Sequence, residues 1–196
     1  MSERHSPSPV QVPPLVEAAR AGDKKAQGDL LRQHARLVEW ALRRLVGRTP
    51  DLEDLVQEVF LEALRGLPRY RGDAKFETWL QRVAVHVACR WLRAPRRRYA
   101  TLALAPDDGA IPPHAADEAQ TRQAFERAHE LLDRLTPPKR VAFLLHVAMG
   151  HSTREVAALM GSTHAAAKAR IWFARRELLA FANEDPLLAA WAKDGR

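Results

Sequence analysis

The side chains best suited to chemistry in this chain are cationic groups, spaced to bind phosphate. Arg82, His86 and Arg90 recur every four residues, and Arg93 follows three residues later. Residues three and four apart share one face of a helix, so this spacing predicts a basic stripe. The planar guanidinium binds phosphate oxygens bidentately, and a stripe of such groups releases counterions from a nucleic-acid backbone. The stripe therefore predicts nucleic-acid binding.

A surface of opposite charge precedes this stripe. Apolar residues recur with the helical period across Asp51–Leu64, which predicts an amphipathic helix that ends near Gly66 and Pro68. Its polar face is acidic, with Asp51, Glu53, Asp54, Glu58 and Glu62. Early acids complement a helix N-terminus, which explains the first three but not Glu58 and Glu62. The face is either simply solvated or binds a basic partner.

A loop and a second amphipathic helix connect these features. Apolar residues keep the helical period from Phe76 to Trp91, so we expect a helix after the loop 68–75. Trp79 and Trp91 are expected in the core. Tyr70 and Phe76 are better candidates for stacking on unpaired bases, which aromatic rings do without requiring a particular sequence.

Three motifs in this half carry a family resemblance. The runs DLVQEVF (54–60), YRGD (70–73) and FETWL (76–80) resemble the second conserved region of bacterial RNA polymerase sigma factors, especially the extracytoplasmic-function group. The resemblance spans about Leu15 to Arg98. It implies that the acidic helix docks on the clamp of the β′ subunit, through Asp54, Gln57, Glu58 and Leu61.

The same resemblance implies that the following loop and helix open the promoter −10 element and capture a flipped base. His86 stands where relatives can carry an asparagine that reads this base, so the resemblance leaves the −10 preference open. The residues assigned to the −10 element are Tyr70, Arg71, Asp73, Phe76, Arg82, His86 and Arg90.

The C-terminal half has the pattern of a helix-turn-helix unit. Helical stretches at Glu126–Leu135 and Lys139–Met149 are followed by Ser152 and Glu155, which fit a capping box. Gly161 then marks the turn before a basic helix, predicted over His164–Ala182. The second helix of such a unit enters the major groove with its N-terminal residues. A surface helix with scattered arginines remains the alternative.

This half resembles the fourth conserved region of the same family, over about Ala124–Leu179. The resemblance implies −35 recognition and contact with the β flap of polymerase. Two departures, Ala165–Ala167 and Phe173, remove polar groups that are common in relatives and leave the −35 specificity open. The residues assigned to the −35 element are Thr163, His164, Lys168, Arg170 and Arg175.

Whole-chain properties agree with a DNA-binding protein. The 196 residues carry a net charge of +7, which favours a polyanionic partner. No apolar run is long enough to insert into a membrane, and the single cysteine, Cys89, fits a reducing cytoplasm. We expect an all-α protein of two small helical domains, 15–98 and 122–182, joined by a flexible linker at 99–121. Tails are expected at 1–14 and 183–196.

Catalysis is not expected. The histidines form no HExxH pair, and the chain has no CxxC, phosphate-binding loop or nucleophile elbow, so we expect no metal and no cofactor. The sequence predicts a factor that binds core RNA polymerase and promoter DNA. Two alternatives are a stand-alone helix-turn-helix regulator and an adaptor that binds protein through the acidic helix. The family often has an anti-sigma inhibitor, and no residue here identifies one.

Overall fold

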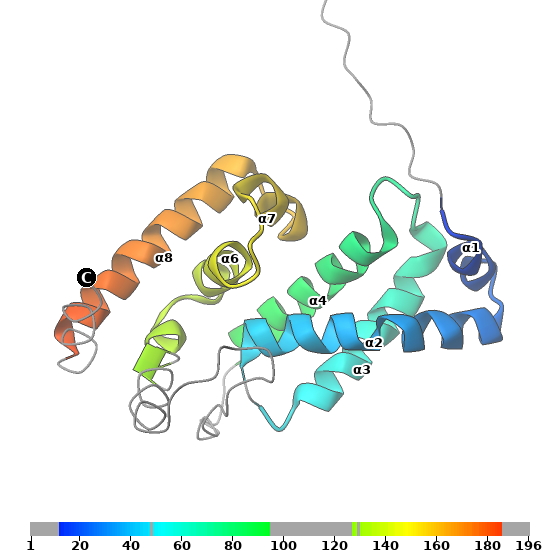
Figure 1. Cartoon of the computed structure of the whole chain (residues 1–196), viewed down its shortest axis with the longest axis horizontal. Helices are drawn as coiled ribbons and strands as arrows, with labels where there is room; N and C mark the ends of the chain where they lie inside the picture. Colours follow the sequence, from blue (N-terminus) through cyan, green and yellow to red (C-terminus); the bar gives the residue numbers. More distant parts are fainter. Residues whose placement is uncertain (1–11, 48, 95–126, 129, 186–196) are drawn as a thin grey trace, which may run out of the picture.

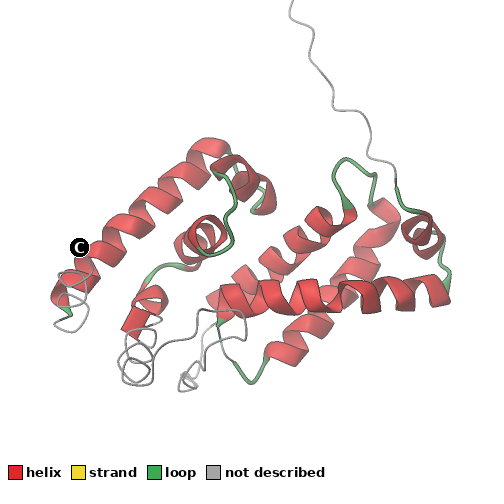
Figure 2. Cartoon of the chain, in the orientation of Figure 1, coloured by secondary structure: helices red, strands yellow, loops and turns green. Residues whose placement is uncertain are grey.

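The computed structural model describes residues 12–47, 49–94, 127–128 and 130–185. Every regular element in these residues is a helix, which confirms the all-α prediction (Figure 2). The predicted linker at 99–121, and most of both predicted tails, lie outside the described residues.

The N-terminal bundle consists of α1 (Pro14–Arg20), α2 (Lys24–Val46), α3 (Leu52–Gly66) and α4 (Phe76–Arg93), with a short 3₁₀ turn after α3. Its centre is closed by large apolar side chains that are almost fully buried. They come from all the longer helices and include Leu42, Leu45, Val59 and Leu80. Burial of such side chains stabilises the bundle by about 1.5–3 kcal/mol each.

The start of α3 is tied to α4 by a side-chain hydrogen bond. The helix begins at Leu52, but the side chain of Asp51 makes no capping hydrogen bond. It instead accepts a hydrogen bond from the indole Nε1 of Trp91 at 3.1 Å. Asp51 therefore ties the start of α3 to the end of α4, close to where the basic stripe finishes.

The C-terminal bundle consists of α6 (Pro137–Val147), α7 (Thr153–Leu159) and α8 (His164–Glu184), preceded by helical residues at 130–134. The predicted capping box is confirmed, since Ser152 and Glu155 exchange two hydrogen bonds at the start of α7. Gly161 adopts a φ of 58° in the turn before α8, a left-handed conformation that favours glycine. These local features set the angle between α7 and α8.

The two bundles pack directly on each other. Helices α6 and α7 lie against α4, and α6 also contacts α2 (Figure 1). Buried side chains form one continuous apolar cluster that extends from α1 through α4 to α8. Helix α4 is thus central to the molecule, with helices of its own bundle on one side and the C-terminal bundle on another.

Candidate nucleic-acid interface

The basic stripe predicted on α4 divides into two parts. Arg82 and His86 are exposed, and the His86 ring Nδ1 is 2.7 Å from the carbonyl oxygen of Arg82. Arg90 instead reaches α3, where its guanidinium pairs with Glu58 at 2.8 Å and Glu62 at 2.7 Å. Partial burial opposes the Arg90 charge, but hydrogen bonds to the two carboxylates outweigh it and raise the pKa of the guanidinium. Arg82 and His86 remain the groups best placed to meet DNA.

The acidic helix presents a coherent exposed face. Asp54 and Gln57 are exposed, and Leu61 follows one turn later with 53% of its surface exposed. Glu58 lies between them and is half-buried because of its pair with Arg90. The four residues occupy positions i, i+3, i+4 and i+7, which lie on one side of a helix. An apolar side chain framed by acidic and amide groups suits a protein partner.

The aromatic residues of the loop have a structural role. Tyr70 and Phe76 are each only 4% exposed, and their rings meet edge to face with centroids 5.7 Å apart. Trp79 packs against both rings. The Tyr70 hydroxyl also donates a 2.6 Å hydrogen bond to the carbonyl of Ala74. Stacking on a base requires an accessible ring face, so in this structure an unpaired base cannot stack on the ring of Tyr70 or Phe76.

These buried rings hold the loop and thereby present its polar side chains. Arg71 and Asp73 are exposed between the two anchors. The guanidinium of Arg20 on α1 donates to the carbonyl of Tyr70 at 3.1 Å, which fixes the loop from the other side. The loop can therefore offer one cation and one acceptor to a nucleic acid from a defined backbone.

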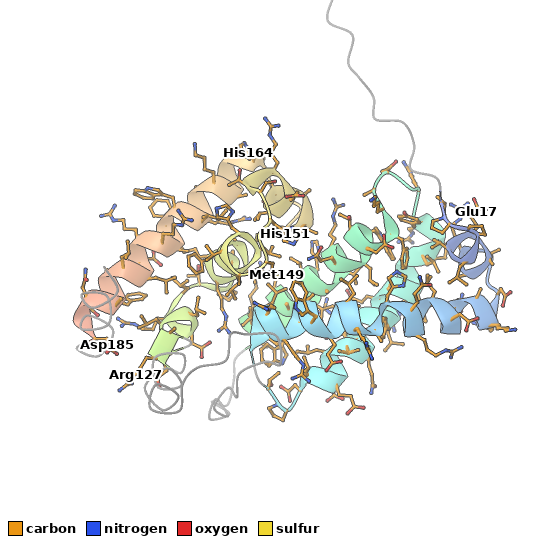
Figure 3. The ribbon with its side chains drawn as sticks, viewed as in Figure 1. Glu17, Arg127, Met149, His151, His164 and Asp185 are labelled. Atoms are coloured by element: carbon orange, nitrogen blue, oxygen red, sulfur yellow. The ribbon has the colours of Figure 1, made fainter. Side chains whose placement is uncertain are left out.

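The helix-turn-helix is well formed around the start of α8. The Thr163 hydroxyl caps α8 by accepting from the amide of Ala166, and the His164 ring Nε2 lies 2.8 Å from the hydroxyl of Thr153 on α7 (Figure 3). His164, Lys168 and Arg175 are exposed. At about 100° per residue they fall within roughly 40° of one another around α8, so they form one cationic edge.

Arg170 lies on the other side of the same helix. Two residues separate it from Lys168, which corresponds to roughly 200° around the helix axis. Arg170 is half-buried and lines a pocket of about 90 Å³ together with His86 and Arg93 of the N-terminal bundle. The structure thus separates Lys168 from Arg170 and turns Arg170 toward α4.

Sequence reasoning missed the side of α4 that faces this pocket. Val85 and Cys89 are 1% and 7% exposed, and both line it. Burial raises the pKa of the Cys89 thiol, although the charges of Arg93 and Arg170 act in the opposite direction. The sequence signal for this second packing surface is that Val85 and Cys89 are apolar and four residues apart, and so share one side of the helix beside the basic stripe.

The described residues contain neither a metal-binding cluster nor a membrane-spanning helix. No group of three or more His, Cys, Asp or Glu side chains in this part of the chain is arranged to hold a metal ion. None of the described helices is both long and apolar enough to cross a bilayer.

Comparison with known proteins gives matches to both halves. Residues 30–98 match the family model of sigma-70 region 2, and residues 125–178 match that of sigma-70 region 4. The chain is 31% identical over 174 residues to the ECF RNA polymerase sigma-E factor of Haemophilus influenzae, covering 82% of this chain and 89% of the relative. It is 32% identical over 186 residues to the sigma-E factor of Escherichia coli, covering 84% and 90%.

A solved structure shares the arrangement of helices. CnrH, determined in complex with the cytosolic domain of CnrY, superimposes with a TM-score of 0.60 and 25% sequence identity. The superposition covers 87% of this chain and 96% of CnrH. The likeness therefore extends over both bundles.

Proposed function

The chain belongs to the extracytoplasmic-function group of RNA polymerase sigma factors. From this premise we propose which of its surfaces bind polymerase, the −10 element and the −35 element. A protein of this family is an initiation factor without catalytic activity of its own. It binds core RNA polymerase and promoter DNA, and directs promoter-specific transcription. The stand-alone regulator considered from the sequence is therefore excluded.

We propose that Asp54, Gln57, Glu58 and Leu61 bind the clamp of the β′ subunit. Support comes from their shared side of α3 and from the exposure of Asp54, Gln57 and Leu61. The apolar Leu61 side chain supplies area that is lost from water on binding, while Asp54 supplies charge complementarity to a basic groove. This exposed face is the observation that carries the proposal.

The −10 element is assigned to Arg71 and Asp73 of the loop and to Arg82 and His86 of α4. All four side chains are exposed, the first two in the loop before α4 and the other two on α4 itself, which supports the assignment. Tyr70 and Phe76 position the loop from the core, and Arg90 connects α4 to the acidic helix. The domain 15–98 is thus a unit for polymerase binding and promoter opening.

The −35 element is assigned to the start of α8 within the domain 122–182. His164, Lys168 and Arg175 form its exposed cationic edge, Thr163 fixes the helix start, and Arg170 lies on the opposite flank. Flanking cations of this kind suit the two phosphate backbones that border a major groove. Contact between this bundle and the β flap completes the proposed set of polymerase contacts.

The setting and further partners follow from the family. We propose that the protein acts in the cytoplasm, because RNA polymerase works there. Because CnrH was determined in complex with the cytosolic domain of CnrY, an inhibitory partner of comparable kind is proposed for this chain.

The test is co-elution of the purified full-length protein with bacterial core RNA polymerase on a sizing column. We expect stoichiometric co-elution for the wild type and loss of co-elution for Asp54→Lys. Glu17→Lys, an equal charge reversal at an exposed residue of α1, is the matched control and should co-elute normally. Co-elution of Asp54→Lys at wild-type stoichiometry would contradict the assignment of this face to the clamp.

A further inference from the structure

The exposed cations near the start of α8 border a strip of alanine side chains. Lys168 belongs to the cationic edge of the helix, and Arg170 lies on the opposite flank. Ala165 and Ala169 are exposed between them. At about 100° per residue, Ala165 lies roughly 60° from Lys168 around the helix axis, and Ala169 lies roughly 100° from both cations. The outward side of the first two turns therefore offers methyl groups between two flanks of positive charge.

Polar side chains at the same end of α8 already have partners inside the protein. The Thr163 hydroxyl accepts a hydrogen bond from the amide of Ala166 at 3.2 Å. The His164 ring Nε2 lies 2.8 Å from the hydroxyl of Thr153, at the junction of α7 and α8 where Figure 3 labels His164. The hydroxyl of Ser162, just before the cap, is buried. Base edges beside Ala165 would therefore meet a methyl group.

Thymine is the base that a strip of methyl groups favours in a major groove. Its C5 methyl projects into the groove, whereas cytosine carries no methyl there. Contact between this methyl and an alanine Cβ removes apolar area from water. A G·C pair presents only hydrogen-bonding groups on its groove edge, and methyl groups that cover them leave them without partners. A strip of alanines thus favours A·T pairs over G·C pairs.

The spacing of the two alanines sets the length of the strip. Ala165 and Ala169 are about 6 Å apart along the helix axis. Base pairs stack about 3.4 Å apart, so the contacts fall within about two or three consecutive pairs. The exposed ring of Trp172 follows on the same side, fixed by Phe173 edge to face at 4.9 Å and by the guanidinium of Arg176 at 5.5 Å. This large side chain ends the strip of small ones.

We propose that Ala165 and Ala169 determine −35 specificity through contact with thymine methyl groups, so that the chain prefers A·T pairs opposite this strip. The proposal rests on the function proposed above, because it concerns which bases the start of α8 reads. Lys168 and Arg170 position the helix through phosphate contacts, which carry no direct sequence information. The two alanines supply the discrimination between base pairs that these cations lack.

The first arm of the test finds the preferred −35 sequence. The full-length protein is combined with bacterial core RNA polymerase, and the complex selects from promoter duplexes whose −35 region is randomised. We expect two or three consecutive positions to be enriched in A·T pairs. A selected −35 sequence made only of G·C pairs would overturn the proposal.

The second arm replaces each thymine of the selected window by uracil, which lacks only the C5 methyl. The readout is the ratio of affinities for the thymine and uracil duplexes, in which a general loss of affinity cancels. We expect a ratio of about four for each contacted thymine, which corresponds to ~0.8 kcal/mol. A ratio of one at every thymine would overturn the methyl contact, whereas a −35 sequence still selected by the complex would leave the proposed function standing.

Glycine variants assign the contact to single residues. Ala165→Gly and Ala169→Gly each remove one Cβ, and each should lower the ratio to about one at one thymine and leave it unchanged at the others. Ala180→Gly is the matched control, since Ala180 is exposed on α8 about 16 Å further along the axis than Ala169, and it should keep the wild-type ratios.

The remaining outcomes separate the two proposals. Wild-type ratios in both Ala165→Gly and Ala169→Gly would overturn the role of these alanines, even if uracil weakened binding. If the complex with core polymerase formed but selected no −35 sequence, the −35 assignment of α8 would fail, and the thymine contact would fail with it.

Discussion

The guanidinium of Arg90 on α4 lies 2.8 Å from the carboxylate of Glu58 on α3. This pair joins the two surfaces that carry the proposed function, because Glu58 belongs to the polymerase-binding face and Arg90 to the basic stripe. Both side chains are about half exposed, so the pair itself stabilises the fold by no more than about 1 kcal/mol. Its main consequence is that a charge change at Glu58 acts on both surfaces.

Charge reversal at Glu58 should therefore weaken both core binding and stability, whereas charge reversal at Asp54 should weaken core binding alone. Glu58→Lys is expected to weaken core binding and also to place an ammonium beside Arg90, lowering stability by about 0.5–1 kcal/mol. Asp54→Lys should weaken core binding at least about tenfold, or ~1.4 kcal/mol, without lowering the melting temperature. Competition binding to core polymerase and thermal melts measure the two effects. A melting temperature of Asp54→Lys well below wild type would show that Asp54 also supports the fold.

Tyr70→Phe should test the structural role of the buried ring. The substitution keeps the packing against Phe76 but removes the hydrogen bond from the hydroxyl to Ala74, at an expected cost of about 1 kcal/mol. Urea denaturation measures the loss. If base stacking were the role of Tyr70, the phenylalanine variant would keep wild-type stability and promoter melting, because its ring could stack equally well.

The same substitution should change the stability of the protein at high pH. Burial raises the pKa of the Tyr70 hydroxyl above its ordinary value of 10.0, with Glu77 and Asp73 adding to the effect. A raised folded-state pKa means that the neutral phenol contributes stability fully below the unfolded-state pKa. That contribution is lost as pH rises through the folded-state pKa. Wild type should therefore lose more stability than Tyr70→Phe above pH 10, as measured by urea denaturation at a series of pH values.

Lys168→Ala should weaken binding to a −35 duplex through the loss of one phosphate contact. The expected signature is a decrease of about one in the slope of log affinity against log salt, with a similar loss for unrelated sequences. Fluorescence anisotropy across a salt series measures this slope. Arg36→Ala on α2, far along the chain from α8, is a matched loss of an exposed cation and should leave the slope unchanged. A loss confined to one base sequence would instead show that Lys168 reads a base edge.

Local rules predict much of this fold because they act within one helix. The apolar period predicts a helix from Phe76 to Trp91, and in the structure α4 spans Phe76–Arg93. The capping box at Ser152 is likewise a three-residue motif, and it forms as predicted. Such features depend on neighbours in sequence, so the sequence is sufficient to find them.

The candidate site is harder to predict because burial depends on distant residues. An aromatic residue beside a basic loop is expected to stack on a base. In the structure, however, the His34 ring on α2 packs edge-on against Phe76, with ring centroids 5.1 Å apart, and helps to bury it. Val85 and Cys89 look like minor apolar positions until α6 and α7 cover them. The exposed part of the site, which includes Asp54 and Lys168, lies where periodicity placed it, since exposure on an amphipathic helix follows from spacing.

Gly161 and Gly28 should respond in opposite directions to the same substitution. Gly161 has a φ of 58° in the turn before α8, where an alanine costs about 1 kcal/mol. The added Cβ would meet the His86 ring at an ordinary contact distance of 3.7 Å, so the cost comes from the backbone. Gly28 lies inside α2, where alanine is favoured by about 0.5–1 kcal/mol and would face only the flexible end of Arg32.

Thermal melts of Gly161→Ala and Gly28→Ala are expected to shift down and up, respectively. Gly161→Asn should recover part of the loss, because asparagine tolerates the left-handed conformation better than alanine does. If asparagine were no better than alanine, the contact with His86 would be the cause rather than the backbone.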